Sequence, residues 1–367
     1  MKFNKNFFQT LLFALLVFGM SAWGLLSPDK DYTDAERRPL AQFPDISAEN
    51  ILSGKFMTDF ESYSVDQLPA RDSLRSLKSL FALNIMQNKD SNGVYQLGGH
   101  LSKLEYPLDD DMLLYACQKF EYLYNTYLKD TDTNPYLCIV PDKNRYLNPG
   151  SGYLNMDYDR LYSIMHQNTP FLAPVRVDEL LDIDDYYRTD THWKQENLLP
   201  VANALATAMK APLPGDMQQL TVDTPFYGVY CGQLPIGAAP DSISYLTSDI
   251  LQACTVTYFD GKAQQKGDMY DLTKAGSKDA YELFLSGVQP FITIESPMAK
   301  SQKELVVFRD SFGSSLIPLL AESYSKITVV DIRYMRSDML GRFVAFDDQD
   351  VLFLYSTLVL NSSTSLN

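Results

Sequence analysis

The sequence predicts an α/β fold in which helices cover both faces of a parallel β-sheet. Between residues 112 and 358, short apolar runs alternate with amphipathic stretches, and this order of strand, helix and strand is typical of parallel sheets. One run, Leu137–Val140, ends at Pro141, as expected of a buried strand that stops at a turn. Apolar residues make up 46% of the 367-residue chain, so a full hydrophobic core is expected.

Local patterns place the individual elements along this part of the chain. Helical spacing of apolar residues predicts helices over Met112–Leu128, Tyr158–His166 and Asn197–Met209, and from beyond Phe308 to about Tyr324. Short β-rich runs predict strands over Leu137–Val140, Pro170–Val175, Leu305–Phe308, Ile327–Ile332 and Val351–Leu358.

The alternation breaks between about residues 211 and 301, a stretch rich in Gly, Pro, Tyr and Asp. We interpret this stretch as a long insertion with some β character. Insertions of this size beside an active face commonly shape substrate binding.

The first 26 residues predict a membrane segment. Lys2 and Lys5 precede an apolar stretch from Phe7 to Leu26, which is long enough to cross ~30 Å of hydrocarbon. Lysines before such a segment favour an inside N-terminus, so we predict a single-pass anchor with an extracytoplasmic body. The alternative is a signal peptide cleaved after Ala22-Trp23-Gly24, which would release a secreted body.

Residues 27–91 are expected to form a helical region next to the anchor. Apolar side chains recur there at helical spacing, as at Phe56, Phe60 and Tyr63, and Pro69 separates two such stretches. Residues 92–367 then make up the main domain, including the insertion at 211–301.

Charge and residue counts exclude several classes of function. The formal net charge is −15, which repels phosphate backbones, so we expect no nucleic-acid partner. The four cysteines show no C-x-x-C spacing and three histidines are present, so we expect no metal site and no cofactor. Whether two of the cysteines pair outside the cytoplasm is left open.

Ser311 directly follows a predicted strand and precedes a predicted helix, within Arg309-Asp310-Ser311-Phe312-Gly313. Its side chain would lie at the carboxyl edge of the sheet, where unpaired backbone N–H groups begin the helix. Such a position suits a nucleophile that must stabilise an oxyanion. By position alone, a helix-capping serine fits equally well.

Asp190 and His192 favour the catalytic interpretation. Two residues apart in an extended loop, their side chains face the same way. The carboxylate can then accept from one imidazole nitrogen and leave the other to take a proton from serine. His100 lies in a Gly-Gly-His loop without an acid nearby and His166 lies late on a helix, so His192 is the best-placed base. The alternative is a surface histidine beside a solvated aspartate.

Several short motifs, in this order, resemble the DHHW family and its relatives, the alginate O-acetyltransferase-like SGNH proteins. Asp190-Thr191-His192-Trp193 is similar to the motif that names the family, with Thr191 in place of a histidine. The stretch from Arg309 to Gly313 is similar to its serine motif, with Arg309 replacing the glycine of ordinary GDS-type hydrolases. Further likenesses lie at residues 36–44, 68–72, 92–95 and 140–146. The order Asp, His, Ser resembles a circular permutation of the ordinary SGNH arrangement.

The resemblance implies an SGNH-like serine O-acetyltransferase or O-acetylesterase that modifies an exported or cell-surface polysaccharide. Ser311 would be acylated, His192 would be the general base and Asp190 would orient it. The backbone N–H of Ser311 would supply one oxyanion donor, while the second donor is not identified. The acetyl donor would be a membrane-bound O-acyltransferase.

Six further residues are candidates for substrate binding: Lys143, Tyr146, Tyr187, Arg188, Trp193 and Arg309. Structural ion pairs explain the two arginines equally, and the aromatic pair Tyr187 and Trp193 either stacks on sugar or packs the loop. The alternative function is a non-catalytic carbohydrate-binding or assembly protein, whose surface would be the aromatic residues of the insertion: Phe226, Tyr227, Tyr230 and Tyr258.

Overall fold

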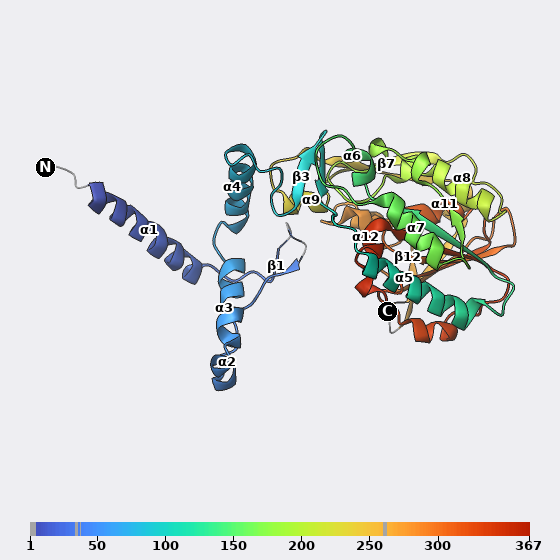
Figure 1. The fold of residues 1–367 in the computed structure, drawn as a ribbon, viewed down its shortest axis with the longest axis horizontal. Coiled ribbons are helices and arrows are strands. Elements are labelled where there is room, and N and C mark those ends of the chain that lie inside the picture. Colours follow the sequence, from blue (N-terminus) through green and yellow to red (C-terminus); the bar gives the residue numbers. More distant parts are fainter. Residues whose placement is uncertain (1–4, 34–35, 37, 260–262) are drawn as a thin grey trace. The chain divides into compact units, whose positions relative to one another are not determined.

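The computed structural model describes residues 5–33, 36, 38–259 and 263–367 (Figure 1), so Lys2 of the predicted anchor and Arg37 lie outside the described residues. The chain divides into two compact units. The first comprises Met1–Tyr95 with Val229–Ala238, and the second comprises Gln96–Gly228 with Ala239–Asn367.

An eight-stranded sheet forms the centre of the second unit, in the order β10-β9-β11-β13-β12-β14-β5-β6. Its strands are β5 (Asn134–Val140), β6 (Ala173–Val175), β9 (Thr255–Phe259), β10 (Gln264–Gly267), β11 (Phe291–Glu295), β12 (Glu304–Arg309), β13 (Lys326–Val330) and β14 (Asp350–Ser356). The predicted strands at 137–140, 305–308, 327–332 and 351–358 all lie in this sheet.

The sheet is mixed, whereas the sequence predicted a parallel one. The strands from β13 to β6 run parallel to one another, as expected. The three insertion strands β9, β10 and β11 extend the sheet antiparallel beyond β13. Four residues of sequence separate β9 from β10, and a short connection permits antiparallel pairing, whereas parallel pairing needs a long crossover.

Helices cover both faces of the sheet, as predicted. On one face α8 (Leu199–Ala208) and α11 (Gly313–Leu320) share a core with Leu305 and Val307 of β12. On the other face α5 (Asp110–Leu123) and α7 (Tyr158–Asn168) share a core with Val306 and Phe308. Because successive strand residues point to opposite faces, a strand that is buried on both sides has a continuous run of apolar residues in its sequence.

The remaining elements of the second unit are short, apart from one hairpin. They are β4 (His100–Lys103), α6 (Asn144–Leu147), β7 (Gln218–Phe226), β8 (Asp241–Thr247), α10 (Asp249–Ala253) and α12 (Thr357–Leu360), with β3 (Val94–Leu97) pairing β4 and β7 pairing β8. A π-helical turn, Tyr124–Leu128, continues α5, and 3₁₀ turns occur at Asp178–Leu180, Ile183–Asp185, Gln195–Asn197, Leu272–Lys274, Ala280–Leu283, Ser337–Arg342 and Ser363–Ser365.

The first unit is largely helical. It contains α1 (Lys5–Leu26), β1 (Tyr32–Thr33), β2 (Arg38–Pro39), α2 (Ala48–Leu52), α3 (Lys55–Asp66), α4 (Arg71–Asn84) and α9 (Val229–Gln233). Helix α1 buries none of its side chains and is long and apolar enough to cross a membrane.

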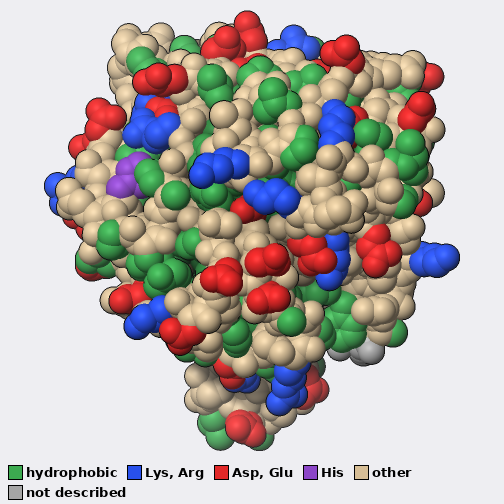
Figure 2. Space-filling view, turned by 90° about the vertical axis from the view of Figure 1, so that its right-hand side faces the viewer, with side chains coloured by type: hydrophobic (Ala, Val, Ile, Leu, Met, Phe, Trp, Pro, Cys, Tyr) green, Lys and Arg blue, Asp and Glu red, His purple; other side chains and the backbone are tan. Residues whose placement is uncertain are grey.

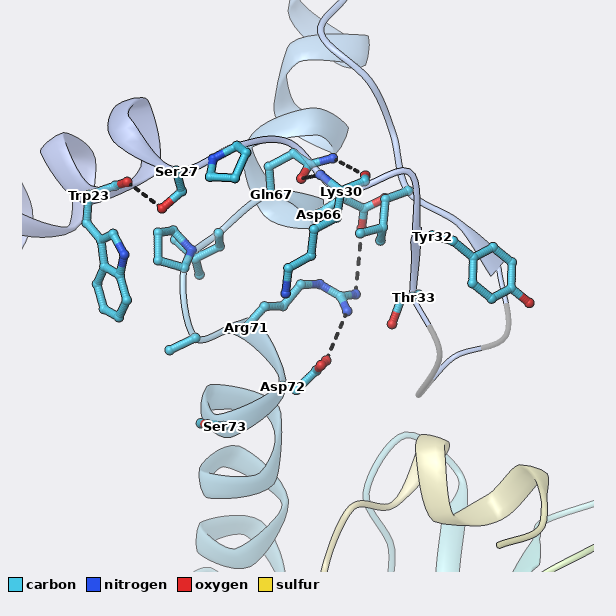
Figure 3. Close-up of a pocket in the computed structure, with 15 residues that line it drawn as sticks. Trp23, Ser27, Lys30, Tyr32, Thr33, Asp66, Gln67, Arg71, Asp72 and Ser73 are labelled. Carbon is cyan, nitrogen blue, oxygen red and sulfur yellow. Dashed lines mark hydrogen bonds and ion pairs between the residues drawn. The ribbon is translucent and has the colours of Figure 1, made fainter. Parts of the chain in front are cut away.

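Charged side chains explain two of the motifs near the N-terminus. Asp66 accepts from both terminal nitrogens of Arg38, at 2.7 and 2.6 Å, and Glu36 pairs with Arg71 at 2.8 Å. The contact between Glu36 and Arg71 ties the stretch 36–44 to the stretch 68–72. Beside them lies a hollow of about 540 Å³ at the end of α1, lined by Trp23, Lys30 and Arg71 among others (Figure 3).

The surface matches the acidic composition. On the face drawn in Figure 2, acidic side chains gather near the middle and basic side chains are dispersed among neutral ones. This distribution accords with the net charge of −15.

Candidate active site

Ser311 lies in the turn between β12 and α11, at the carboxyl edge of the sheet. The neighbouring Asp310, which is fully buried, fixes this turn. Its carboxylate accepts from the backbone N–H of Phe312 at 3.0 Å and from that of Ser356, at the end of β14, at 2.7 Å. The serine is therefore held by the adjacent parallel strand and remains partly exposed to solvent.

Asp190 and His192 lie in a closed loop between Tyr186 and Trp193, which pair as an isolated β-bridge. The backbone N–H of Tyr187 donates to the carbonyl of His192 at 3.1 Å, which closes the loop from within. Asp190 is 1% exposed, whereas the His192 side chain keeps 13% of its surface exposed. The carboxylate is thus buried beneath an imidazole that solvent can reach.

The two loops meet, although they lie more than a hundred residues apart in the sequence. Nδ1 of His192 lies 2.6 Å from Oδ1 of Asp190, and Nε2 of the same ring lies 2.8 Å from Oγ of Ser311. Both distances are those of hydrogen bonds. This chain of carboxylate, imidazole and hydroxyl can move the serine proton to the imidazole as the hydroxyl attacks an electrophile.

Two further side chains tie the histidine loop to the serine turn. The indole N–H of Trp193 donates to the carbonyl of Phe312 at 3.0 Å. The side-chain amide of Gln195 donates to the carbonyl of Ser315 at 2.6 Å. Both side chains are completely buried, so the bonds form away from water.

Asp241, on β8 in the insertion, supports the histidine loop and was not anticipated from the sequence. Its carboxylate accepts from the backbone N–H groups of Arg188 and Thr189, at 2.9 and 2.7 Å, and from the Thr189 hydroxyl at 2.6 Å. No local pattern marks such a residue, because its partners lie about fifty positions earlier in the chain.

Gly228 packs directly against the same loop. A β-carbon at this position would lie 2.4 Å from Cβ of Asp190 and 2.4 Å from the carbonyl atoms of Thr189. Its N–H also donates to the Thr189 hydroxyl at 2.9 Å. The close approach of the two backbones therefore requires glycine.

We expect Gly228→Ala to lower kcat by about 100-fold, because the overlapping atoms belong largely to the backbone and the Asp190 loop must move to relieve them. Steady-state kinetics with an acetyl ester would measure this loss. Gly276→Ala is the control, because a β-carbon there meets nothing within 4 Å. Wild-type kcat in Gly228→Ala would contradict the prediction.

Tyr281, in the insertion, was also missed by sequence reasoning. Its ring lies parallel to that of His192, with centroids 3.8 Å apart and an angle of 8° between the planes. The side chain is 4% exposed. A single tyrosine among 24 carries no sequence signal that would connect it with a histidine 89 positions earlier.

Lys143 lies beneath the histidine loop. Its ammonium donates to the carbonyls of Tyr187 at 2.9 Å and Asp190 at 2.7 Å, and the residue is 2% exposed. This position indicates support of the loop, whereas the sequence suggested a lining of the cleft. Tyr146 donates its hydroxyl to the carbonyl of Asp178 at 2.7 Å and packs on Tyr186.

The other candidates for substrate binding differ in how far their side chains are exposed to solvent. Tyr187 and Trp193 are 0% exposed, so the structure favours the loop-packing alternative over a sugar-stacking wall. Arg309 is 1% exposed and donates to the Ser314 hydroxyl at 3.0 Å, which makes it part of the interior. Arg188 is about half exposed and lies 3.5 Å from Asp241. Of these four, it is the one that solvent reaches readily.

Burial lowers the pKa of Lys143 from 10.5 to about 7, since the charged form loses its hydration. As the pH falls from about 10.5 to about 7, the unfolded chain takes up a proton that the folded chain resists. We therefore expect wild type to lose stability relative to Lys143→Met over this range, by at most about 5 kcal/mol, with a constant difference below about pH 7. Denaturant unfolding of both proteins at several pH values measures this, and a difference independent of pH would refute it.

Comparisons with known proteins agree with this architecture. No family model and no curated protein matches the sequence. Among solved structures, a DHHW family protein from Eubacterium siraeum superimposes with a TM-score of 0.62 at 22% identity, covering 75% of this chain and 94% of that one. Bacillus cereus PatB1, solved with a sulfonyl adduct, superimposes with a TM-score of 0.59 at 17% identity, covering 73% of this chain and 95% of that one. The chain therefore has the fold of the DHHW family protein and of PatB1, and the resemblance predicted from short motifs is confirmed at the level of the fold.

Proposed function

We propose that this chain is a membrane-anchored, extracytoplasmic O-acetyltransferase or O-acetylesterase that acts on an exported or cell-surface polysaccharide through an acetyl-Ser311 intermediate. The observation that carries the proposal is the hydrogen-bonded series Asp190, His192 and Ser311, with spacings of 2.6 and 2.8 Å. The exposure of these three side chains supports the proposal, because the Asp190 carboxylate is enclosed while Ser311 and the His192 imidazole reach solvent.

In the first step Ser311 Oγ attacks the acetyl carbonyl while His192 Nε2 takes its proton. Asp190 accepts from Nδ1–H, which holds the required tautomer and stabilises the imidazolium that forms. The bond from the acetyl carbon to the leaving oxygen then breaks, and His192 returns the proton to that oxygen. The product is an acetyl ester on Ser311.

The backbone N–H of Ser311 is our candidate for one oxyanion donor. Among the described residues it has no acceptor within hydrogen-bond distance. An N–H group at the start of a helix, free of an internal partner, can bind negative charge that develops on the carbonyl oxygen.

In the second step a sugar hydroxyl or water attacks the acetyl-serine, with His192 as the base. Transfer and hydrolysis differ in this acceptor alone. The apolar helix α1 supports the anchored location, in which a membrane-bound O-acyltransferase would supply the acetyl group to a catalytic body held near the membrane.

Exposure to p-nitrophenyl acetate, followed by rapid quenching and peptide mass spectrometry, tests the intermediate. We expect an acetyl group on the peptide that contains Ser311, and its loss when an acceptor oligosaccharide is added. Acetylation at another residue would overturn the assignment. Absence of any adduct and of ester turnover would favour the alternative of a non-catalytic carbohydrate-binding protein.

A further inference from the structure

Two features of Tyr281 relate it to the proposed catalytic series. The first is the parallel contact of its ring with the His192 imidazole, at 3.8 Å and 8°. Phe312 also borders the imidazole, but at 5.0 Å and with the planes inclined by 53°. Tyr281 is thus the side chain whose ring lies flat on the imidazole.

The second feature is the hydroxyl group of Tyr281. It lies 2.8 Å from the hydroxyl of Ser315, on the first turns of α11, four residues beyond Ser311. One side chain therefore contacts both halves of the site, the imidazole through its ring and the serine helix through its oxygen. A buried hydroxyl needs such a partner, and the partner here belongs to the element that carries the nucleophile.

The Tyr281 ring restricts the χ2 torsion of His192, which is otherwise poorly defined. The χ2 torsion of histidine is broad, unlike the three narrow wells of a saturated bond. The hydrogen bond from Nδ1 to Asp190 fixes one atom of the imidazole. A further contact is needed to fix the orientation of the imidazole plane. A flat aromatic neighbour supplies that constraint, and its negative face attracts the imidazolium that forms when Ser311 loses its proton.

We propose that Tyr281 is a positioning residue for the reaction, which fixes the plane of the His192 ring so that Nε2 points at Ser311 Oγ. This inference rests on the proposed function and extends it, because it makes the insertion part of the catalytic machinery as well as a substrate-binding segment. A tyrosine that only fills the core would leave the reactivity of Ser311 unchanged when replaced.

The rate of covalent modification of Ser311 by phenylmethylsulfonyl fluoride provides the test, with p-nitrophenyl acetate turnover measured alongside. In this modification Oγ bonds to sulfur, fluoride leaves and His192 accepts the serine proton. It reports activation of Ser311 without any need for an acceptor or acetyl group.

We expect Tyr281→Leu to lower both the sulfonylation rate and kcat by about 10- to 100-fold with KM unchanged, since the defect is one of orientation. Tyr281→Phe keeps the ring and should stay within about threefold of wild type. The matched control is Tyr324→Leu, which removes another fully buried tyrosine whose hydroxyl binds the carboxylate of Asp350, the first residue of β14 and thus at the edge of the sheet opposite Ser311. It should lower the unfolding midpoint and leave both rates unchanged.

The outcomes separate this inference from the proposed function. If wild type reacts at Ser311 and Tyr281→Leu reacts equally fast, the positioning role is wrong while the proposed function stands. Equal slowing in Tyr324→Leu would reduce the effect to general destabilisation and also overturn the role. If neither reagent modifies Ser311 in wild type, the proposed function fails and this inference fails with it.

Discussion

Replacement of Ser311 by alanine is expected to lower kcat for acetyl ester hydrolysis by about 10⁶-fold. The alanine removes the single oxygen that His192 Nε2 contacts at 2.8 Å, so no acyl-enzyme can form. In the proposed mechanism neither Asp190 nor His192 can replace the covalent step, since the members of such a triad act as a unit. The measurement is the burst of p-nitrophenol from p-nitrophenyl acetate, which should vanish in the variant.

The variant should keep its fold, because the turn around Ser311 is held by the buried carboxylate of Asp310. A circular dichroism spectrum and an unfolding midpoint like those of wild type would establish this. Ser301→Ala is the control, since that serine precedes β12 and bonds the Ser323 carbonyl, whereas Ser311 follows the opposite end of the same strand. A normal burst in Ser311→Ala would place the nucleophile elsewhere.

Asp190→Asn is expected to lower kcat by about 10⁴-fold while leaving KM nearly unchanged. An asparagine of the same shape still fills the buried site, but its amide group can donate to Nδ1 and stabilise the wrong tautomer of His192. Nε2 would then carry a hydrogen and could not accept the serine proton. The substitution also removes the negative charge that stabilises the imidazolium in the transition state.

Asp241→Asn is the matched comparison for this variant, because it makes the same chemical change at a carboxylate that supports the same loop from β8 without touching the imidazole. Asp241 accepts three hydrogen bonds from Arg188 and Thr189, so its replacement should loosen the loop and lower kcat by about 10- to 100-fold. Equal losses in the two variants would mean that Asp190 acts through loop support alone. Activity of Asp190→Asn within tenfold of wild type would exclude it from the proton relay.

The sequence carried strong information about the elements that position the site. The run Leu305–Phe308 and the amphipathic stretch Met112–Leu128 are local patterns, and periodicity records directly which side of an element is buried. The placement of Ser311 followed from the same logic, because a residue between a buried strand and a helix must lie at the edge of the sheet. The pairing of Asp190 with His192 followed from their spacing of two and from the scarcity of histidine.

The roles of several candidate residues depended on contacts that no local pattern records. Tyr187 and Trp193 have the composition of a sugar-binding wall, yet both point inward and are 0% exposed. Lys143 resembled a cleft residue, yet its ammonium binds two carbonyls of the histidine loop. The side to which such a residue points is decided by the packing of the segment opposite, which lies far away in the chain.

The sequence by itself determined the two-sided sheet and its helices, and it predicted Asp190, His192 and Ser311 as candidate catalytic residues. Tertiary structure decided that these residues meet within hydrogen-bond distance, that the insertion adds antiparallel strands, and that Tyr281, Asp241 and Gly228 surround the histidine loop. The physical reason is the sequence separation over which each effect acts. Backbone propensity and hydrophobic periodicity act over a few residues, whereas the geometry of the site depends on contacts that span from about 40 to more than a hundred positions and exist only once the chain has folded.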